Sequence, residues 1–119
     1  MNVFDADRAE IAGKLAAGGV QAVTVDPRSQ VPCVLVELPR GFGGDTRQGI
    51  GGWQVETHVH LIAAPPGDLD ATTWLLDQLE AVLVVYPGAE FEPTTVTRND
   101  ADCPAYLIRL TRSITSPNC

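Results

Sequence analysis

A chain of 119 residues with 45% hydrophobic and 19% charged residues is long enough and apolar enough to bury a core. This composition predicts a single domain over residues 1–119 and excludes wholesale disorder. The formal net charge of −7, without any cluster of lysine or arginine, argues against free nucleic acid as a partner.

The sequence shows no targeting or cofactor signature. No apolar run approaches the roughly 18 residues of a membrane span, and the acidic start at residues 1–7 is unlike a signal peptide. We therefore expect a soluble chain that is not exported and has no membrane partner. Cys33, Cys103 and Cys119 share no C-x-x-C spacing, so neither a disulfide framework nor a zinc site is predicted, and no cofactor is expected.

The first predicted element is a helix over residues 5–17. Its apolar residues recur at helical spacing, and Asp5 or Asp7 can accept hydrogen bonds from the free N–H groups of its first turn. The Gly18-Gly19 pair ends the helix, because glycine adopts the left-handed cap without strain.

Two short strands are predicted next, over residues 20–25 and 31–38. Both runs are rich in valine, and the turn residues at 26–29 between them suggest a hairpin. The second run is apolar on both faces, which places it inside the sheet and the first run at an edge. A glycine-rich loop over residues 39–52 follows, and a connection of this length is usually functional or disordered.

Residues 53–64 alternate cleanly between apolar and polar side chains, which predicts a half-buried antiparallel strand. The polar face carries Glu56, His58 and His60, and we expect both histidines to be exposed or at an interface. A metal pair or an acid–base pair on this face is the alternative interpretation.

A second helix is predicted over residues 68–86, with Asp68 or Asp70 as its cap. One broad apolar stripe runs along it, wide enough to cover a sheet: Leu75, Leu76, Leu79, Val82, Leu83 and Tyr86. Two strands over residues 89–98 and 105–115 complete the domain, joined by an acidic turn at 99–102 and followed by a short tail at 116–119.

The predicted fold is therefore α+β, with the order α-β-β-β-α-β-β. It has a mostly antiparallel sheet of about five strands with two helices on one face. No nucleophile stands beside a histidine or cysteine in a known motif, and the glycine-rich loop precedes a strand where a phosphate-binding loop would precede a helix. We expect no enzyme activity. The alternative is a small metal-binding enzyme that uses Glu56, His58 and His60.

The order of these elements resembles the tail terminator (tail completion) proteins of long-tailed bacteriophages, particularly those of actinobacterial hosts. The likeness covers nearly the whole chain. It rests on the acidic first helix, the Val-rich strand Pro32-Cys33-Val34-Leu35-Val36, the glycine-rich insertion and the strand Gly51-Gly52-Trp53-Gln54-Val55-Glu56-Thr57-His58-Val59. The second helix with Leu75-Leu76-Asp77-Gln78-Leu79, the Tyr86-Pro87 break and the final strand Leu107-Ile108-Arg109-Leu110-Thr111 continue the match.

The resemblance implies a structural virion protein at the head–tail junction, made in the host cytoplasm. Such proteins form a ring, usually a hexamer, which sits on the tail tube, stops its polymerisation and offers a docking surface to the head connector or stopper protein. Another head-to-tail connector, a minor tail component or a binding module without a virion role are the competing interpretations.

We expect the contacts of such a ring to involve two regions of the chain. The loop from Arg40 to Gly52 reaches a neighbour or the tube, with Arg40 and Arg47 pairing with carboxylates and Phe42 as an apolar anchor. The remaining candidates are one aromatic residue near the start of the second helix and charged residues of the last two strands: Trp74, Glu90, Glu92, Arg98, Arg109 and Arg112.

The arginines of the last two strands are predicted to meet acidic groups of a neighbouring subunit. Those groups are Glu90 and Glu92, or the acidic tip with Asp100 and Asp102. Charge reversal at Arg109 and Arg112 should then weaken assembly without unfolding the monomer.

Overall fold

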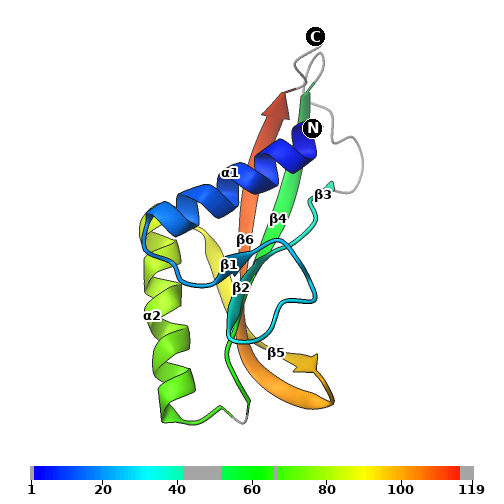
Figure 1. The fold of residues 1–119 in the computed structure, drawn as a ribbon. Coiled ribbons are helices and arrows are strands. Elements are labelled where there is room, and N and C mark those ends of the chain that lie inside the picture. Colours follow the sequence, from blue (N-terminus) through cyan, green and yellow to red (C-terminus); the bar gives the residue numbers. More distant parts are fainter. Residues whose placement is uncertain (1, 42–51, 66, 116–119) are drawn as a thin grey trace.

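The computed structural model describes residues 2–41, 52–65 and 67–115 (Figure 1). Within these residues, two helices and six strands follow one another in the order α1 (Val3–Ala17), β1 (Val23–Thr24), β2 (Cys33–Val36), β3 (Arg40–Gly41), β4 (Gly52–Ile62), α2 (Leu69–Val85), β5 (Glu90–Arg98) and β6 (Ala101–Thr115). The predicted α+β class and the predicted element order are confirmed, with β3 as a short additional strand.

Helix α1 begins two residues earlier than predicted. Asn2 is its N-cap, and the side-chain oxygen of Asn2 accepts a hydrogen bond of 2.8 Å from the backbone N–H of Asp5. The prediction of Asp5 or Asp7 as the cap was therefore wrong. Asn is as good a cap as Asp, because its short side chain reaches the same free N–H groups. The helix ends at Gly18 as predicted.

The sheet has the strand order β1-β2-β4-β6-β5, and β3 pairs with β4 beyond the end of β2. β1 lies at the edge and β2 inside the sheet, as predicted. The predicted hairpin between them is wrong, because β1 pairs with β2 in parallel. Ser29 N–H donates to the Asp26 carbonyl in the turn that follows β1, and residues 25–32 then return the chain to the end of the sheet where β1 started.

β5 and β6 form a long antiparallel hairpin with a tighter turn than predicted. Arg98 pairs with Ala101, so only Asn99 and Asp100 lie between the strands. Their φ angles are +52° and +63°, as a two-residue type I′ turn requires, and Asn and Asp tolerate this region better than most residues. Residues 101–104, predicted as turn and connection, therefore belong to β6.

Both helices pack on one face of the sheet. The core there unites α1 and α2 with alternate residues of β2, β4 and β6: Ile11, Leu15, Val34, Val36, Val59, Leu61, Leu75, Leu79, Val82, Ile108 and Leu110. Leu76, predicted within the buried stripe of α2, is about half exposed, because it lies on the edge of the helix away from this core.

A second core cluster occupies the opposite face at one end of the sheet. It consists of Cys33, Ile62, Cys103 and Ala105, with Val31 and Val96 packed against it. The β5–β6 hairpin curves away from α2 and closes over this cluster (Figure 1). The Arg98 guanidinium fastens the hairpin to the 25–32 connection through a 2.8 Å hydrogen bond to the Ser29 carbonyl.

The molecule is elongated along β4 and β6. Its extents are 49 × 28 × 26 Å and its radius of gyration is 15.1 Å, against about 13.5 Å for a compact domain of this length. None of the helices in the described part is long and apolar enough to cross a membrane.

Candidate interaction surface

Arg109 projects from β6 on the sheet face opposite the helices. One of its guanidinium nitrogens, Nη2, lies 2.5 Å from Glu92 Oε1, and Nη1 lies 4.0 Å from Glu90 Oε2. Glu90 and Glu92 stand on β5 directly beside this part of β6. The ion pair that the sequence suggested between neighbouring subunits thus forms within one chain. Glu90 is the more available of these carboxylates, with 81% of its side chain exposed.

Arg112 projects toward α1 instead. Its Nη2 atom lies 2.8 Å from Asp7 Oδ1 and 3.5 Å from Glu10 Oε2, and Asp7 is only 7% exposed. Burial raises the pKa of Asp7 above its ordinary value, although the Arg112 guanidinium acts in the opposite direction. Charge reversal at Arg112 would place a carboxylate against Asp7. It would therefore destabilise the monomer, contrary to the expectation from the sequence.

The remaining predicted contact residues lie apart from one another. Trp74 packs against the helix-side core, and its indole N–H donates to Gln21 Oε1 at 3.2 Å. Arg98 is held by its bond to the 25–32 connection, whereas Arg40 is exposed on β3 at the other side of the sheet. Phe42 and Arg47, like most of the 39–52 loop, lie outside the described residues.

The two histidines of β4 are less exposed than expected, and each has its own carboxylate. His58 Nε2 lies 2.6 Å from Glu56 Oε2, and His60 Nδ1 lies 2.6 Å from Glu37 Oε1. His58 is 8% exposed. The two carboxylates come from different strands. Glu56 lies on β4 itself, whereas Glu37 directly follows β2, where its backbone N–H donates to the His58 carbonyl.

The metal site that the sequence offered as an alternative is not assembled in the described part of the chain. His60 pairs with Glu37 and not with Glu56, so Glu56, His58 and His60 do not converge on one point. Within residues 2–41, 52–65 and 67–115, no group of three His, Cys, Asp or Glu side chains is placed to hold a metal ion.

The second core cluster contains two free thiols, Cys33 and Cys103, both buried. Burial raises the pKa of the Cys33 thiol, and the nearby Arg98 guanidinium only partly offsets this. A thiol that is buried and protonated is a poor nucleophile, because the thiolate is the reactive form. Cys33 therefore packs as a small apolar side chain.

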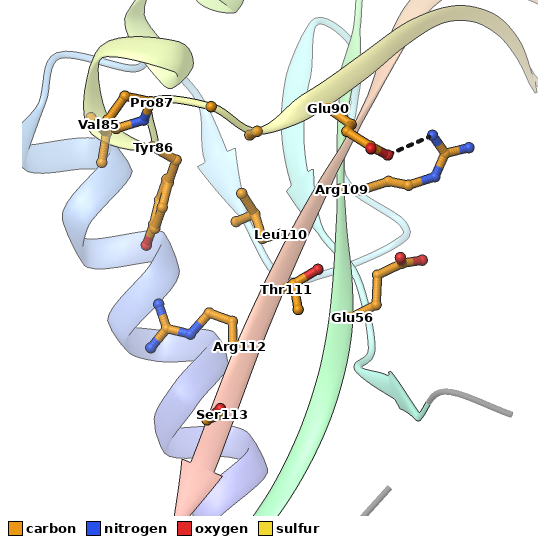
Figure 2. A pocket seen from close by; sticks show the side chains of 12 residues that line it. Glu56, Val85, Tyr86, Pro87, Glu90, Arg109, Leu110, Thr111, Arg112 and Ser113 are labelled. Atoms are coloured by element: carbon orange, nitrogen blue, oxygen red, sulfur yellow. Dashed lines mark ion pairs between the residues drawn. The ribbon is translucent and has the colours of Figure 1, made fainter. Parts of the chain in front are cut away.

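A groove of about 820 Å³ runs along β6 where β5 no longer covers it. We call it the β6 groove (Figure 2). One wall is the end of α2 with Val85, Tyr86 and Pro87, and the other carries charged side chains of the opposite sheet face. The floor is β6 from Arg109 to Ser113. In Figure 2 the side chains of Arg112 and Arg109 leave β6 on opposite sides, toward the helices and toward Glu90.

Two carboxylates that pair with predicted site residues, Asp7 and Glu37, were not predicted in that role, although the sequence carries a signal for each. Asp7 precedes Ile11 and Leu15 by four and eight residues, so it lies on the buried stripe of α1. A buried carboxylate needs a partner, and Arg112 supplies it. Glu37 shares a strand face with Cys33 and Leu35, which predicts a position next to His60, two residues away along the neighbouring strand.

Comparison of the chain with protein-family models and with curated proteins finds no match. The features of the described residues that bear on function are an elongated α+β domain, a sheet with both helices packed on one face, and an accessible groove along β6.

Proposed function

We propose that the chain is a structural virion protein that caps the tail tube of a long-tailed bacteriophage as a ring. The element order carries this proposal, because the helix, the paired short strands, the insertion, the long strand, the second helix and the final hairpin follow one another as in the tail terminator proteins that the sequence resembles. The proposed partners are further copies of the chain, the tail tube protein and the head connector or stopper protein.

The distribution of exposed side chains agrees with a subunit that contacts neighbours. Large apolar side chains are exposed to solvent on several elements, among them Leu38 after β2 and Phe91 on β5. Glu90 and Arg40 are exposed charges at opposite sides of the sheet. Surfaces that differ on the two sides of a subunit suit a head-to-tail contact, which gives a ring where the rotation between subunits closes.

The first test is the mass of the purified protein across a wide concentration range. A ring of about six subunits of 12.7 kDa, near 76 kDa, supports the proposal. The second test adds the protein to polymerising tail tube protein and measures tube length by electron microscopy. Shorter tubes with a protein at one end are expected. Tubes of unchanged length at all protein ratios would contradict the proposal.

A different head-to-tail connector or a minor tail component would share the size and charge of this chain. The place of the protein in the particle distinguishes these from a terminator. Labelled antibody should bind at the junction of tube and head connector, and binding at the distal end of the tail would identify a minor tail component.

A further inference from the structure

The backbone of β6 changes its surroundings at Arg109. β6 pairs with β5 from Ala101 to Arg109 and with β4 from Ala105 to Thr115, so from Leu110 to Thr115 only β4 lies beside it in the described part of the chain. The N–H and C=O groups that point away from β4 in this stretch therefore open into the β6 groove.

The register identifies these groups. The backbone N–H of Glu37 donates to the His58 carbonyl, so the backbone N–H and C=O groups of the even-numbered residues of β4 point away from β6. The backbone N–H of Ala63 donates to the Pro104 carbonyl, so those of the odd-numbered residues point toward β6. Opposite the even-numbered Glu56 and Gln54 stand Thr111 and Ser113. In an antiparallel pair both backbone groups of such residues face outward. Thr111 and Ser113 are exposed, and both line the groove.

In the described part of the chain, proline residues and short strands limit the other edges of the sheet. On β5 the outward-facing residues are the odd-numbered ones, and Pro93 stands among them, where its missing N–H interrupts the edge. On the opposite side, β1 has two residues, and Pro39 precedes β3. Thr111 and Ser113 thus form an edge with two donors and two acceptors beside a groove.

The walls of the groove define what kind of strand would lie there. Side chains of an added strand alternate between the two faces of the sheet. One face meets Val85, Pro87 and Leu110 together with Arg112, whereas the other meets Arg109 with Glu56 and Glu90. On the second face three carboxylates stand against one arginine, because Arg109 faces Glu90 and Glu92 and Glu56 lies on the same wall, whereas Arg112 on the first face already pairs with Asp7 and Glu10.

We propose that the β6 groove binds an extended segment of a partner protein that alternates apolar and basic residues, and that this segment adds to the sheet as a strand beside Thr111 and Ser113. The main-chain bonds supply affinity, and the alternation supplies specificity. The proposal goes beyond the capping function and does not depend on it, since it concerns the isolated chain.

The probe is an N-acetylated, C-amidated peptide of alternating valine and lysine, about six residues long to match the open stretch of β6. Hydrogen exchange of the full chain, followed by NMR, is measured with and without it. The amides of Thr111 and Ser113 should exchange rapidly in the free protein and become protected by the peptide. Those of Leu110 and Arg112, which face β4, should be protected in both states. No change at Thr111 and Ser113 at millimolar peptide would overturn the proposal.

Two N-methylated peptides test the main-chain pairing, one methylated on every valine and one on every lysine. Only one set of alternate amides of the bound peptide points at β6. One methylated peptide should therefore bind at least about tenfold more weakly than the unmethylated peptide, and the other should keep the affinity of the unmethylated peptide. Equal binding of both would show that the peptide does not add as a strand.

A matched pair of variants tests the position. Ser113→Pro removes an outward N–H inside the groove and should weaken binding about tenfold or more. Thr95→Pro makes the same replacement at an outward position of β5 and should leave binding unchanged. Glu90→Lys keeps the backbone intact and leaves this face with two carboxylates and two cations, so the preference for the valine–lysine peptide over a valine–glutamate peptide should largely disappear. A lysine preference as strong in Glu90→Lys as in the wild type would contradict the charge argument.

Discussion

The ion pair between α1 and β6 gives the sharpest test of the packing. Replacing Arg112 by Met keeps much of the aliphatic stem and removes the charge. Asp7, 7% exposed, then loses its only hydrogen-bonding partner in the described part of the chain. Breaking a buried pair from one side typically costs about 3–5 kcal/mol, because the remaining charge stays buried without compensation.

The chain has an alternative that limits this cost: Asp7 can take up a proton. Keeping a carboxyl of ordinary pKa 3.8 neutral at pH 7 costs about 4 kcal/mol, at 1.36 kcal/mol for each pH unit. The loss in Arg112→Met is therefore expected near 3 kcal/mol at pH 7 and cannot much exceed about 4 kcal/mol. At pH 5 the same limit falls to about 1.5 kcal/mol.

The direction of the pH effect follows from the direction of the shift. Burial raises the pKa of Asp7 in the folded state above its unfolded value. Its protonation therefore favours folding, and this contribution is present below the unfolded pKa and lost as the pH rises through the folded pKa. Removing Arg112 raises the folded pKa further, so the difference in stability between variant and wild type should shrink as the pH falls from 8 to 5.

Urea unfolding of the wild type, Arg112→Met, Asp7→Asn and the double variant at several pH values measures these differences. The double variant should be more stable than Arg112→Met at pH 7, because the neutral amide needs no counter-charge. A loss in Arg112→Met that is equal at pH 5 and pH 8, or a double variant less stable than Arg112→Met, would refute the assignment of Asp7 as the buried charge.

Two further predictions concern a helix and the thiols. Gly13→Ala should stabilise the protein by about 0.5–1 kcal/mol, because the added Cβ meets open space in the middle of α1. Gly18→Ala should destabilise it, because the added Cβ would clash with Val85 Cγ2. Thermal unfolding of the two variants and the wild type measures both effects. In a Cys119→Ser background the two thiols of the second core cluster should react with a thiol reagent only as fast as the protein unfolds, and rapid reaction in the folded protein would contradict their burial.

The elements that the sequence predicted well are those with long periodic patterns. The stripe of α2 and the alternation of β4 each extend over more than ten residues, so a local error does not change the result. β1 is the opposite case. Its two residues carry no period, and its parallel pairing depends on where the 25–32 connection returns the chain.

The candidate surface was harder to predict, because its charges have partners that are distant in the sequence. Arg112 and Asp7 are 105 positions apart, and only the packing of α1 across β6 brings them together. Arg112, which the sequence suggested as a contact between subunits, therefore stabilises the fold of a single chain. Arg109 differs, because its partners stand on the adjacent strand of the same hairpin and the register alone specifies them.

The edges of the sheet bear both on the proposed ring and on the proposed addition of a strand at β6. A ring built from this chain needs strand or side-chain contacts at the sides of each subunit, yet Pro93 on β5 and Pro39 before β3 interrupt those edges. Direct pairing of β5 with the β1 side of a neighbour is therefore disfavoured. Ring contacts would then rely on exposed side chains such as Leu38 and Phe91, and the open stretch of β6 would stay free for a segment of another protein. Thr95→Pro should accordingly leave both ring formation and peptide binding intact, whereas Ser113→Pro should weaken only peptide binding.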